Sequence, residues 1–124
     1  MDKIPDQLKR FWEPCDKDQA FFHITTKQNY QSIKNCGYIE PRDPSVRKWA
    51  GMKAIFLSDP DDELYAKYAA RVVEHVKEKH EHLVKLHIKT KNQLYKSTHP
   101  TRTFQVISLS KIPVDEIVSV EPLI

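Results

Sequence analysis

Short apolar segments alternate with polar ones along the chain, and their composition predicts several strands. Each of four segments is rich in β-branched and aromatic residues: AFFHITT (20–26), KAIFLS (53–58), EHLVKLHIKT (81–90) and TFQVISLS (103–110). In 81–90 the apolar positions alternate with charged ones, as in a half-buried strand. The last segment, KIPVDEIVSVEPLI (111–124), predicts a turn followed by a closing strand.

Two segments between these strands have the spacing of helices. Residues 27–36 place Tyr30 and Ile33 on one face, with Thr26 as a suitable N-cap and Gly37 as the residue that ends the helix. A longer helix follows Ser58, where a proline and several acids suit a helix start. Its buried face is predicted from the apolar spacing to be Leu64, Tyr65, Tyr68, Ala69, Val72, Val73 and Val76. The order of elements predicts an α+β fold with a mainly antiparallel sheet.

The remaining segments are expected to be irregular. Residues 1–19 read as an N-terminal arm, with at most a single helical turn, that packs on one domain spanning 20–124. The segment YIEPRDPSVRKWAGM (38–52) predicts a basic, proline-bearing loop, and NQLYKSTHPTR (92–102) predicts a polar loop.

Composition narrows the class of protein. The 124 residues suffice for one compact domain, and 40% apolar residues exclude a disordered chain. No apolar run approaches the ~20 residues of a membrane span, and no signal peptide is visible. We therefore expect a cytoplasmic protein without a membrane partner, in which Cys15 and Cys36 are free thiols, a single disulfide being the alternative. The net charge of +3 permits contact with a nucleotide or nucleic acid but does not require it.

The histidines are the first candidates for chemistry. His75, His80, His82 and His87 lie close in sequence, but their spacing forms no recognised ligand pair, so we predict no metal site. His23 is different because it lies inside an apolar strand, on the same side as Phe21 and Thr25. It is either a hydrogen-bonded core histidine or the polar group of a ligand pocket, and spacing alone favours the core.

Other catalytic arrangements are not indicated. With two glycines the chain has neither a phosphate-binding loop nor a nucleophile elbow. Cys36 ends a predicted helix, where the dipole opposes a thiolate, so a structural role is favoured.

Four segments in order resemble proteins of the ADP-ribosyltransferase fold. FFHITTKQNYQSIKNCGYIEPR (21–42) resembles the opening strand and helix of that family, and KAIFLSDPDDELYAKYA (53–69) resembles its second signature. LVKLHIKTKNQLY (83–95) and TFQVISLSKIPVDEIVSV (103–120) resemble its later strands. The resemblance covers roughly residues 20 to 122. It implies a split, mainly antiparallel sheet with one long and one or two short helices, and NAD as the cofactor.

The resemblance also implies roles for individual residues. His23 would hold a ribose of NAD on the adenosine side, with Thr25 supporting the same strand. Phe56 would stack on the nicotinamide ring, plain core filling being the alternative for this residue. The full set of implied cofactor-binding residues is His23, Thr25, Arg42, Trp49, Phe56, Ser58, Tyr65 and Tyr68.

Transferases of this fold carry an acidic residue late in their sequence. This chain has no acid at the corresponding position, whether it is compared with many relatives or with the rifamycin-modifying branch. Thr103 stands where many relatives carry Glu. HPTRTF (99–104) resembles a stretch of the rifamycin-modifying branch, but the loop before it offers only Asn92 or Gln93 in place of an acid. The catalytic candidates are therefore Arg102, Asn92 and Thr103. A minor alternative is the chemistry of the tRNA 2′-phosphotransferases, for which His23, His99 and Arg102 would serve.

Two functions follow from the resemblance. The first is an NAD-dependent ADP-ribosyltransferase-like protein that modifies a protein, nucleic acid or small molecule, of the compact kind found in bacteria and phages. The second is a relative without transferase activity, a binding module or inhibitor that holds a nucleotide or a protein partner.

Overall fold

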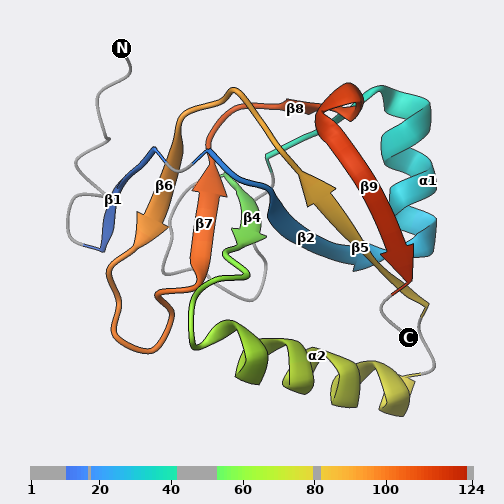
Figure 1. Cartoon of the computed structure of the whole chain (residues 1–124). Coiled ribbons are helices and arrows are strands. Elements are labelled where there is room, and N and C mark those ends of the chain that lie inside the picture. The colour runs from blue at the N-terminus through green and yellow to red at the C-terminus, as the bar shows by residue number, and fades with distance from the viewer. Residues whose placement is uncertain (1–10, 17, 42–52, 80–81, 123–124) are drawn as a thin grey trace.

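The computed structural model describes residues 11–16, 18–41, 53–79 and 82–122, without the side chains of 75–79 (Figure 1). In these ranges the helices are α1 (Lys27–Cys36) and α2 (Tyr65–Lys79), with a short 3₁₀ turn, η2 (Val114–Glu116). The strands are β1 (Trp12–Cys15), β2 (Phe21–Thr26), β3 (Tyr38–Ile39), β4 (Ile55–Ser58), β5 (Leu83–Ile88), β6 (Leu94–Ser97), β7 (Gln105–Ser108), β8 (Ile112–Pro113) and β9 (Ile117–Pro122).

The strands of the described ranges form one large sheet and one small one. Seven strands lie in the order β1-β6-β7-β4-β2-β5-β9, while β3 pairs with β8 as a separate ribbon. Each neighbouring pair is antiparallel. The structure thus confirms the predicted α+β class with a mainly antiparallel sheet.

The large sheet is weakly joined at its centre, between β2 and β4. β2 pairs with β5 along its whole length, from Phe21 opposite Ile88 to Thr26 opposite Leu83. Between β2 and β4, in contrast, a single residue pair is in register, Phe22 with Ser58. The main chains of β2 and β4 therefore separate next to His23, which leaves room for side chains between them.

The caps of α1 match the sequence prediction. Thr26 has extended backbone angles and its side-chain oxygen accepts the backbone N–H of Asn29 at 3.0 Å. Gly37 ends the helix in the left-handed region at φ 97°, and its N–H donates to the carbonyl of Ile33 at 2.9 Å. These two residues fix where α1 starts and stops.

Helix α2 begins later than the proline and acidic residues after Ser58 predicted. The Asp59 side chain accepts the backbone N–H of Asp61 at 2.9 Å, and the Asp62 side chain accepts that of Leu64 at 3.0 Å. Aspartates that bond their own backbone two residues on favour turns over helix. The helix therefore starts at Tyr65. The residues predicted to form its buried face are only half-buried where the structure describes their side chains, as for Tyr68 and Val72, and the side chain of Val76 lies outside the described residues.

Two strands of the large sheet lie where sequence reasoning placed none, and in the small sheet β3 occupies the start of the expected loop 38–52 and β8 the expected turn after Lys111. Residues 12–15 of the expected arm form β1 instead of a helical turn, and residues 94–97 of the expected polar loop form β6. The two strands pair with each other from Trp12 opposite Ser97 to Cys15 opposite Leu94. Both are only four residues long, and β1 pairs with a distant part of the chain, whereas β6 also pairs with the next strand, β7, so short length rather than distance alone hid them in the local pattern.

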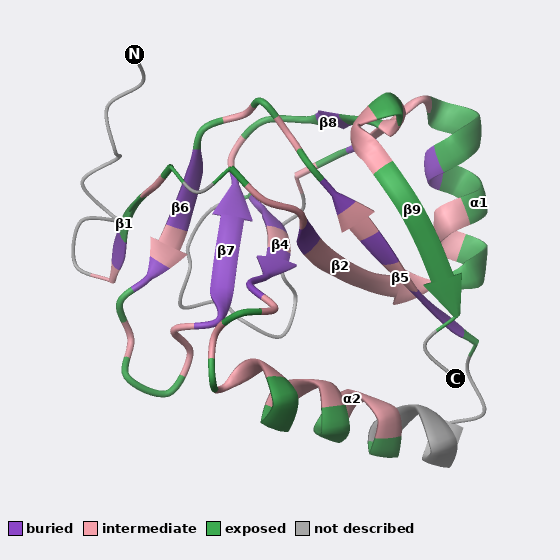
Figure 2. Cartoon of the chain, in the orientation of Figure 1, coloured by how far each residue is buried: buried purple, intermediate pink, exposed green. Residues whose placement is uncertain are grey.

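Two apolar clusters occupy the two faces of the sheet. The larger cluster lies beneath α1 and comprises Phe21, Ile33, Ile39, Ile55, Leu57, Val84, Leu86, Ile88, Leu94, Val106 and Ile112. The smaller cluster lies on the opposite face and comprises Trp12, Ala54, Tyr95 and Ile107. All four residues of β7 are buried, which makes β7 the most enclosed strand in the drawing (Figure 2).

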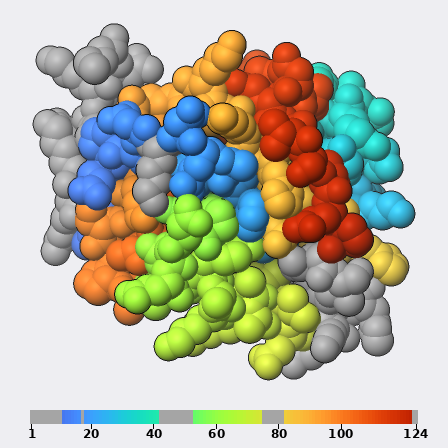
Figure 3. All heavy atoms as spheres, in the orientation of Figure 1, coloured from blue at the N-terminus to red at the C-terminus, as the bar shows by residue number. Residues whose placement is uncertain are grey.

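The last strand of the sheet is much more exposed. β9 pairs on one side with β5, and Val118 on it is 59% exposed. Its atoms lie on the molecular surface beside those of α1 (Figure 3). Both cysteines, Cys15 and Cys36, are free thiols. Among the described residues, no helix has the length and apolarity needed to cross a membrane.

Candidate functional site

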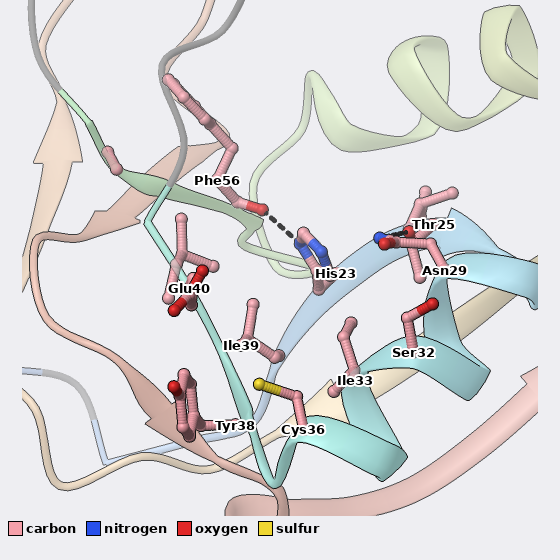
Figure 4. A pocket seen from close by; sticks show the side chains of 13 residues that line it. His23, Thr25, Asn29, Ser32, Ile33, Cys36, Tyr38, Ile39, Glu40 and Phe56 are labelled. Carbon is pink, nitrogen blue, oxygen red and sulfur yellow. Dashed lines mark hydrogen bonds between the residues drawn. The ribbon is translucent and has the colours of Figure 1, made fainter.

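A pocket of about 400 Å³ lies where α1, β2, β3 and β4 meet (Figure 4). Its volume is within the range of roughly 300–1,000 Å³ that is usual for small-molecule sites. It opens beside the place where β2 and β4 separate. Its lining combines polar and apolar residues, with apolar surface in excess, and consists of His23, Ile24, Thr25, Asn29, Ser32, Ile33, Cys36, Tyr38, Ile39, Glu40, Ala54, Ile55 and Phe56.

His23 connects the two separated strands with its side chain. Its Nδ1 lies 2.8 Å from the carbonyl oxygen of Phe56 (Figure 4). A carbonyl oxygen only accepts hydrogen bonds, so Nδ1 carries the proton and donates it. In the neutral ring Nε2 is then a hydrogen-bond acceptor, and in the charged ring it is a second donor. The half-buried imidazole is therefore held in one orientation while it lines the pocket.

The start of α1 forms a polar wall. The Asn29 amide donates to the Thr25 hydroxyl at 2.6 Å, which ties the helix to β2. Ser32 follows one turn later, and its hydroxyl contacts the carbonyl of Gln28 at 3.4 Å. The Thr26 cap sets the rotation of α1 so that Asn29, Ser32 and Cys36 all line the pocket. Hydroxyl and amide groups in this arrangement suit the hydroxyls of a sugar.

The opposite wall comes from β3 and the residue after it. The pairing of Ile39 with Ile112 in the small sheet anchors this segment, and Ile39 is buried. Tyr38 and Glu40 flank it and line the pocket. A hydrogen bond with Cys36, together with the charges of Cys36 and Glu40, raises the pKa of the Tyr38 phenol against the opposing effect of Lys111. The Lys111 ammonium lies 4.3 Å from the centre of the Tyr38 ring.

Three predicted cofactor residues meet in this pocket: His23, Thr25 and Phe56. Phe56 contributes differently from the role that the resemblance implies. Its carbonyl points to His23, whereas its ring points away and packs against the smaller cluster (Figure 4). In this structure the ring occupies the position expected of a core residue.

The other described cofactor candidates lie outside the lining. Ser58 is buried on β4 opposite Gln105. The Tyr65 ring meets Phe22 edge-on at 5.6 Å between centroids, and the Tyr68 ring stacks on Phe104 at 4.7 Å. These two tyrosines pack α2 against the rest of the molecule. The predicted contacts of Arg42 and Trp49 lie outside the described residues.

The three catalytic candidates also lie away from the pocket lining. The Asn92 amide donates to the carbonyl of Lys111 at 2.8 Å and closes the turn after β7. The Thr103 hydroxyl donates to Asp62 at 3.0 Å, before α2. Arg102 lies in the turn between β6 and β7, where its N–H donates to the carbonyl of His99 at 2.9 Å. The pocket lining includes none of these three residues.

Sequence reasoning missed much of the polar lining. Three polar residues of α1 lie at helical spacing beside Ile33: Asn29, Ser32 and Cys36. This polar stripe next to the apolar face could have identified them from the sequence. Glu40 gave no such signal, because only the pairing of β3 with β8 brings it to the pocket. Among the described lining residues Glu40 is the one carboxylate.

Comparison with known proteins gave no relative on which to base a function: no protein-family model, no curated protein and no solved structure matches this chain. What the pocket binds is therefore inferred from its own side chains and from the sequence resemblance.

Proposed function

We propose that the chain is an ADP-ribosyltransferase-like protein that binds NAD in the pocket between α1, β2, β3 and β4. The observation that carries this proposal is that His23 and Thr25 line one cavity, to which Phe56 contributes its main chain. The resemblance assigns these residues to the cofactor, although they come from two strands that are far apart in sequence. The volume of about 400 Å³ suits one nucleoside half of NAD at a time.

The lining has the groups that a nucleoside needs. Ribose hydroxyls can exchange hydrogen bonds with the polar side chains of the lining, His23, Thr25 and Asn29. The flat faces of a base or nicotinamide ring can pack on the aliphatic side chains of the lining, Ile33, Ile39 and Ile55. A ligand bound in this way buries its apolar surface and still satisfies its polar atoms.

The reaction open to such a protein is transfer of ADP-ribose. The bond between ribose C1′ and the nicotinamide nitrogen breaks, and nicotinamide leaves with the electron pair. A nucleophile of the acceptor attacks C1′ and gives up its proton. The acceptor would be a protein, a nucleic acid or a small molecule.

A second candidate function is a binding module that holds the nucleotide without transferring it. The observation that favours it is the position of Arg102, Asn92 and Thr103 outside the pocket lining. In this version the pocket would recognise NAD or ADP-ribose, and the protein would act on a partner by binding alone.

Calorimetric titration with NAD and with ADP-ribose tests the proposal. The wild type is expected to bind at least one of the two, and His23→Ala is expected to weaken binding about tenfold, the loss of one to two hydrogen bonds in a desolvated site. His82→Ala is the matched control, since His82 is exposed and lies outside the lining. No heat with either ligand for the wild type would reject the nucleotide pocket.

Chromatographic detection of nicotinamide separates the two versions of the proposal. Release of nicotinamide by the wild type, lost in His23→Ala, identifies a transferase or NAD hydrolase. Binding of NAD with no release over hours identifies the binding module.

A further inference from the structure

We infer that Glu40 makes the pocket selective for the positively charged nicotinamide-riboside half of NAD over its adenosine half. The inference rests on the proposed function and deepens it, because it assigns the part of the ligand that enters. It also differs from the expectation by resemblance, in which His23 holds the ribose on the adenosine side.

Glu40 is held at the pocket by its neighbours in the chain. Ile39 is 4% exposed and pairs with Ile112, so the residue that follows it has a fixed starting point. Figure 4 shows Glu40 on the β3 side of the pocket, across from Thr25 and Asn29 on the other side. A ligand between these walls would therefore have a carboxylate on one side and neutral hydroxyl and amide groups on the other.

Glu40 gives the described part of the pocket lining a negative charge. The lining otherwise contains neutral polar groups, apolar side chains and the imidazole of His23. Tyr38 remains a neutral phenol near neutral pH, since its pKa is raised above the ordinary value of 10.0. The Lys111 ammonium lies against the Tyr38 ring, and Lys111 is not a lining residue.

The two halves of NAD differ in charge where they would meet this carboxylate. The nicotinamide ring attached to ribose is a pyridinium with one positive charge, whereas adenine is neutral and the pyrophosphate is negative. Opposite charges at contact distance favour binding, and like charges oppose it. Glu40 would attract the pyridinium and turn the pyrophosphate away from the β3 wall.

The expected selectivity is modest because Glu40 is exposed. A solvent-exposed charge pair contributes up to about 1 kcal/mol, which is about a fivefold difference in affinity. The difference should shrink as salt is added, since salt screens exposed charges.

Nicotinamide riboside and its reduced dihydro form are the probes that isolate this charge. They share the ribose and the carboxamide, but the reduced form carries a neutral dihydropyridine ring in place of the pyridinium, so the comparison with Glu40→Gln isolates the effect of the charge. Affinities of both are measured calorimetrically at low and high salt for the wild type, Glu40→Gln and Glu63→Gln. Glu63 is an exposed glutamate outside the lining and serves as the control.

The wild type and Glu63→Gln are expected to prefer the oxidised riboside about fivefold at low salt, and Glu40→Gln is expected to bind the two forms equally. Equal binding of both forms by the wild type, or an unchanged preference in Glu40→Gln, overturns the role of Glu40 and leaves the nucleotide pocket intact. If the wild type binds neither riboside, nor NAD or ADP-ribose, the proposed function itself is wrong.

Discussion

At the scale of single residues, His23 shares features of both alternatives considered from the sequence: it is hydrogen-bonded within the fold like a core histidine, and it lines a pocket. Its Nδ1 donates to the main chain of β4, as a core histidine would, while its ring lines the pocket. The hydrogen bond across the open part of the sheet fixes the ring, and a fixed ring loses less entropy when it meets a ligand. On the proposed function, structure and binding therefore depend on the same side chain.

A second key residue, Asp59, supports the fold away from the pocket. Asp59 is fully buried and accepts hydrogen bonds from Gln19 at 2.9 Å and from Lys96 at 3.0 Å. Lys96 also lies 3.4 Å from Asp62. Burial opposes the charge on Lys96, but the bonds and charges of the two aspartates outweigh it and raise its pKa. The cluster joins the residues before β2, the end of β4 and β6.

Asp59→Ala is expected to lower the free energy of unfolding by about 3 kcal/mol, because it leaves a half-buried ammonium without its main partner. Urea unfolding measures the change. Asp61→Ala is the control: Asp61 is exposed and contributes its backbone N–H rather than its side chain, so a change within about 0.5 kcal/mol is expected. A loss below about 1 kcal/mol for Asp59→Ala would show that the cluster is dispensable.

At the scale of elements, the two ends of α1 could be predicted from the sequence, but the pairing of the short strands could not. The cap at Thr26 and the stop at Gly37 depend on residues within one turn, so sequence alone located α1. Strand β1 pairs only with β6, about eighty positions away, and β6, although it also pairs with the next strand β7, is too short to give a clear local signal. The same limit explains the site: His23 and Thr25 were found on one strand, whereas Glu40 needed the β3–β8 pair.

The edge strand β9 is tied to β5 by charges that respond to pH. Glu121 lies 3.0 Å from Nε2 of His87 and 3.1 Å from the Lys85 ammonium. The hydrogen bond from His87, and then the bond and charge of Lys85, lower the pKa of Glu121 below its ordinary 4.5. A lowered carboxyl pKa contributes stability that is present above 4.5 and is lost as the pH falls through the lowered value.

Thermal unfolding of the wild type and Glu121→Gln should therefore differ at about pH 7 and converge at acid pH, as the pH falls through the lowered pKa of Glu121. Glu63→Gln, an exposed glutamate with no role in this edge, should show no such pH-dependent difference. If the gap between wild type and Glu121→Gln is the same at both pH values, the ion pair does not stabilise β9.

At the scale of the whole molecule, the separation of β2 from β4 produces the pocket. A sheet paired along its full length would leave no space there, since neighbouring strands lie about 4.8 Å apart. Here a single residue pair joins the two halves, α1 and β3 form the walls, and the His23 side chain bridges part of the opening. The α+β class was predictable from the order of elements, but this opening depends on strand registers that the sequence pattern does not specify.

Amide chemical shifts of isotopically labelled protein, followed during titration with NAD, test most directly whether this opening is a nucleotide site. Shifts are expected in the lining segments 23–25, 29–36, 38–40 and 54–56, with β9 unaffected. His23→Ala should weaken the response in these same segments. No shifts, or shifts centred on α2 or β9 instead of the pocket, would contradict the proposal.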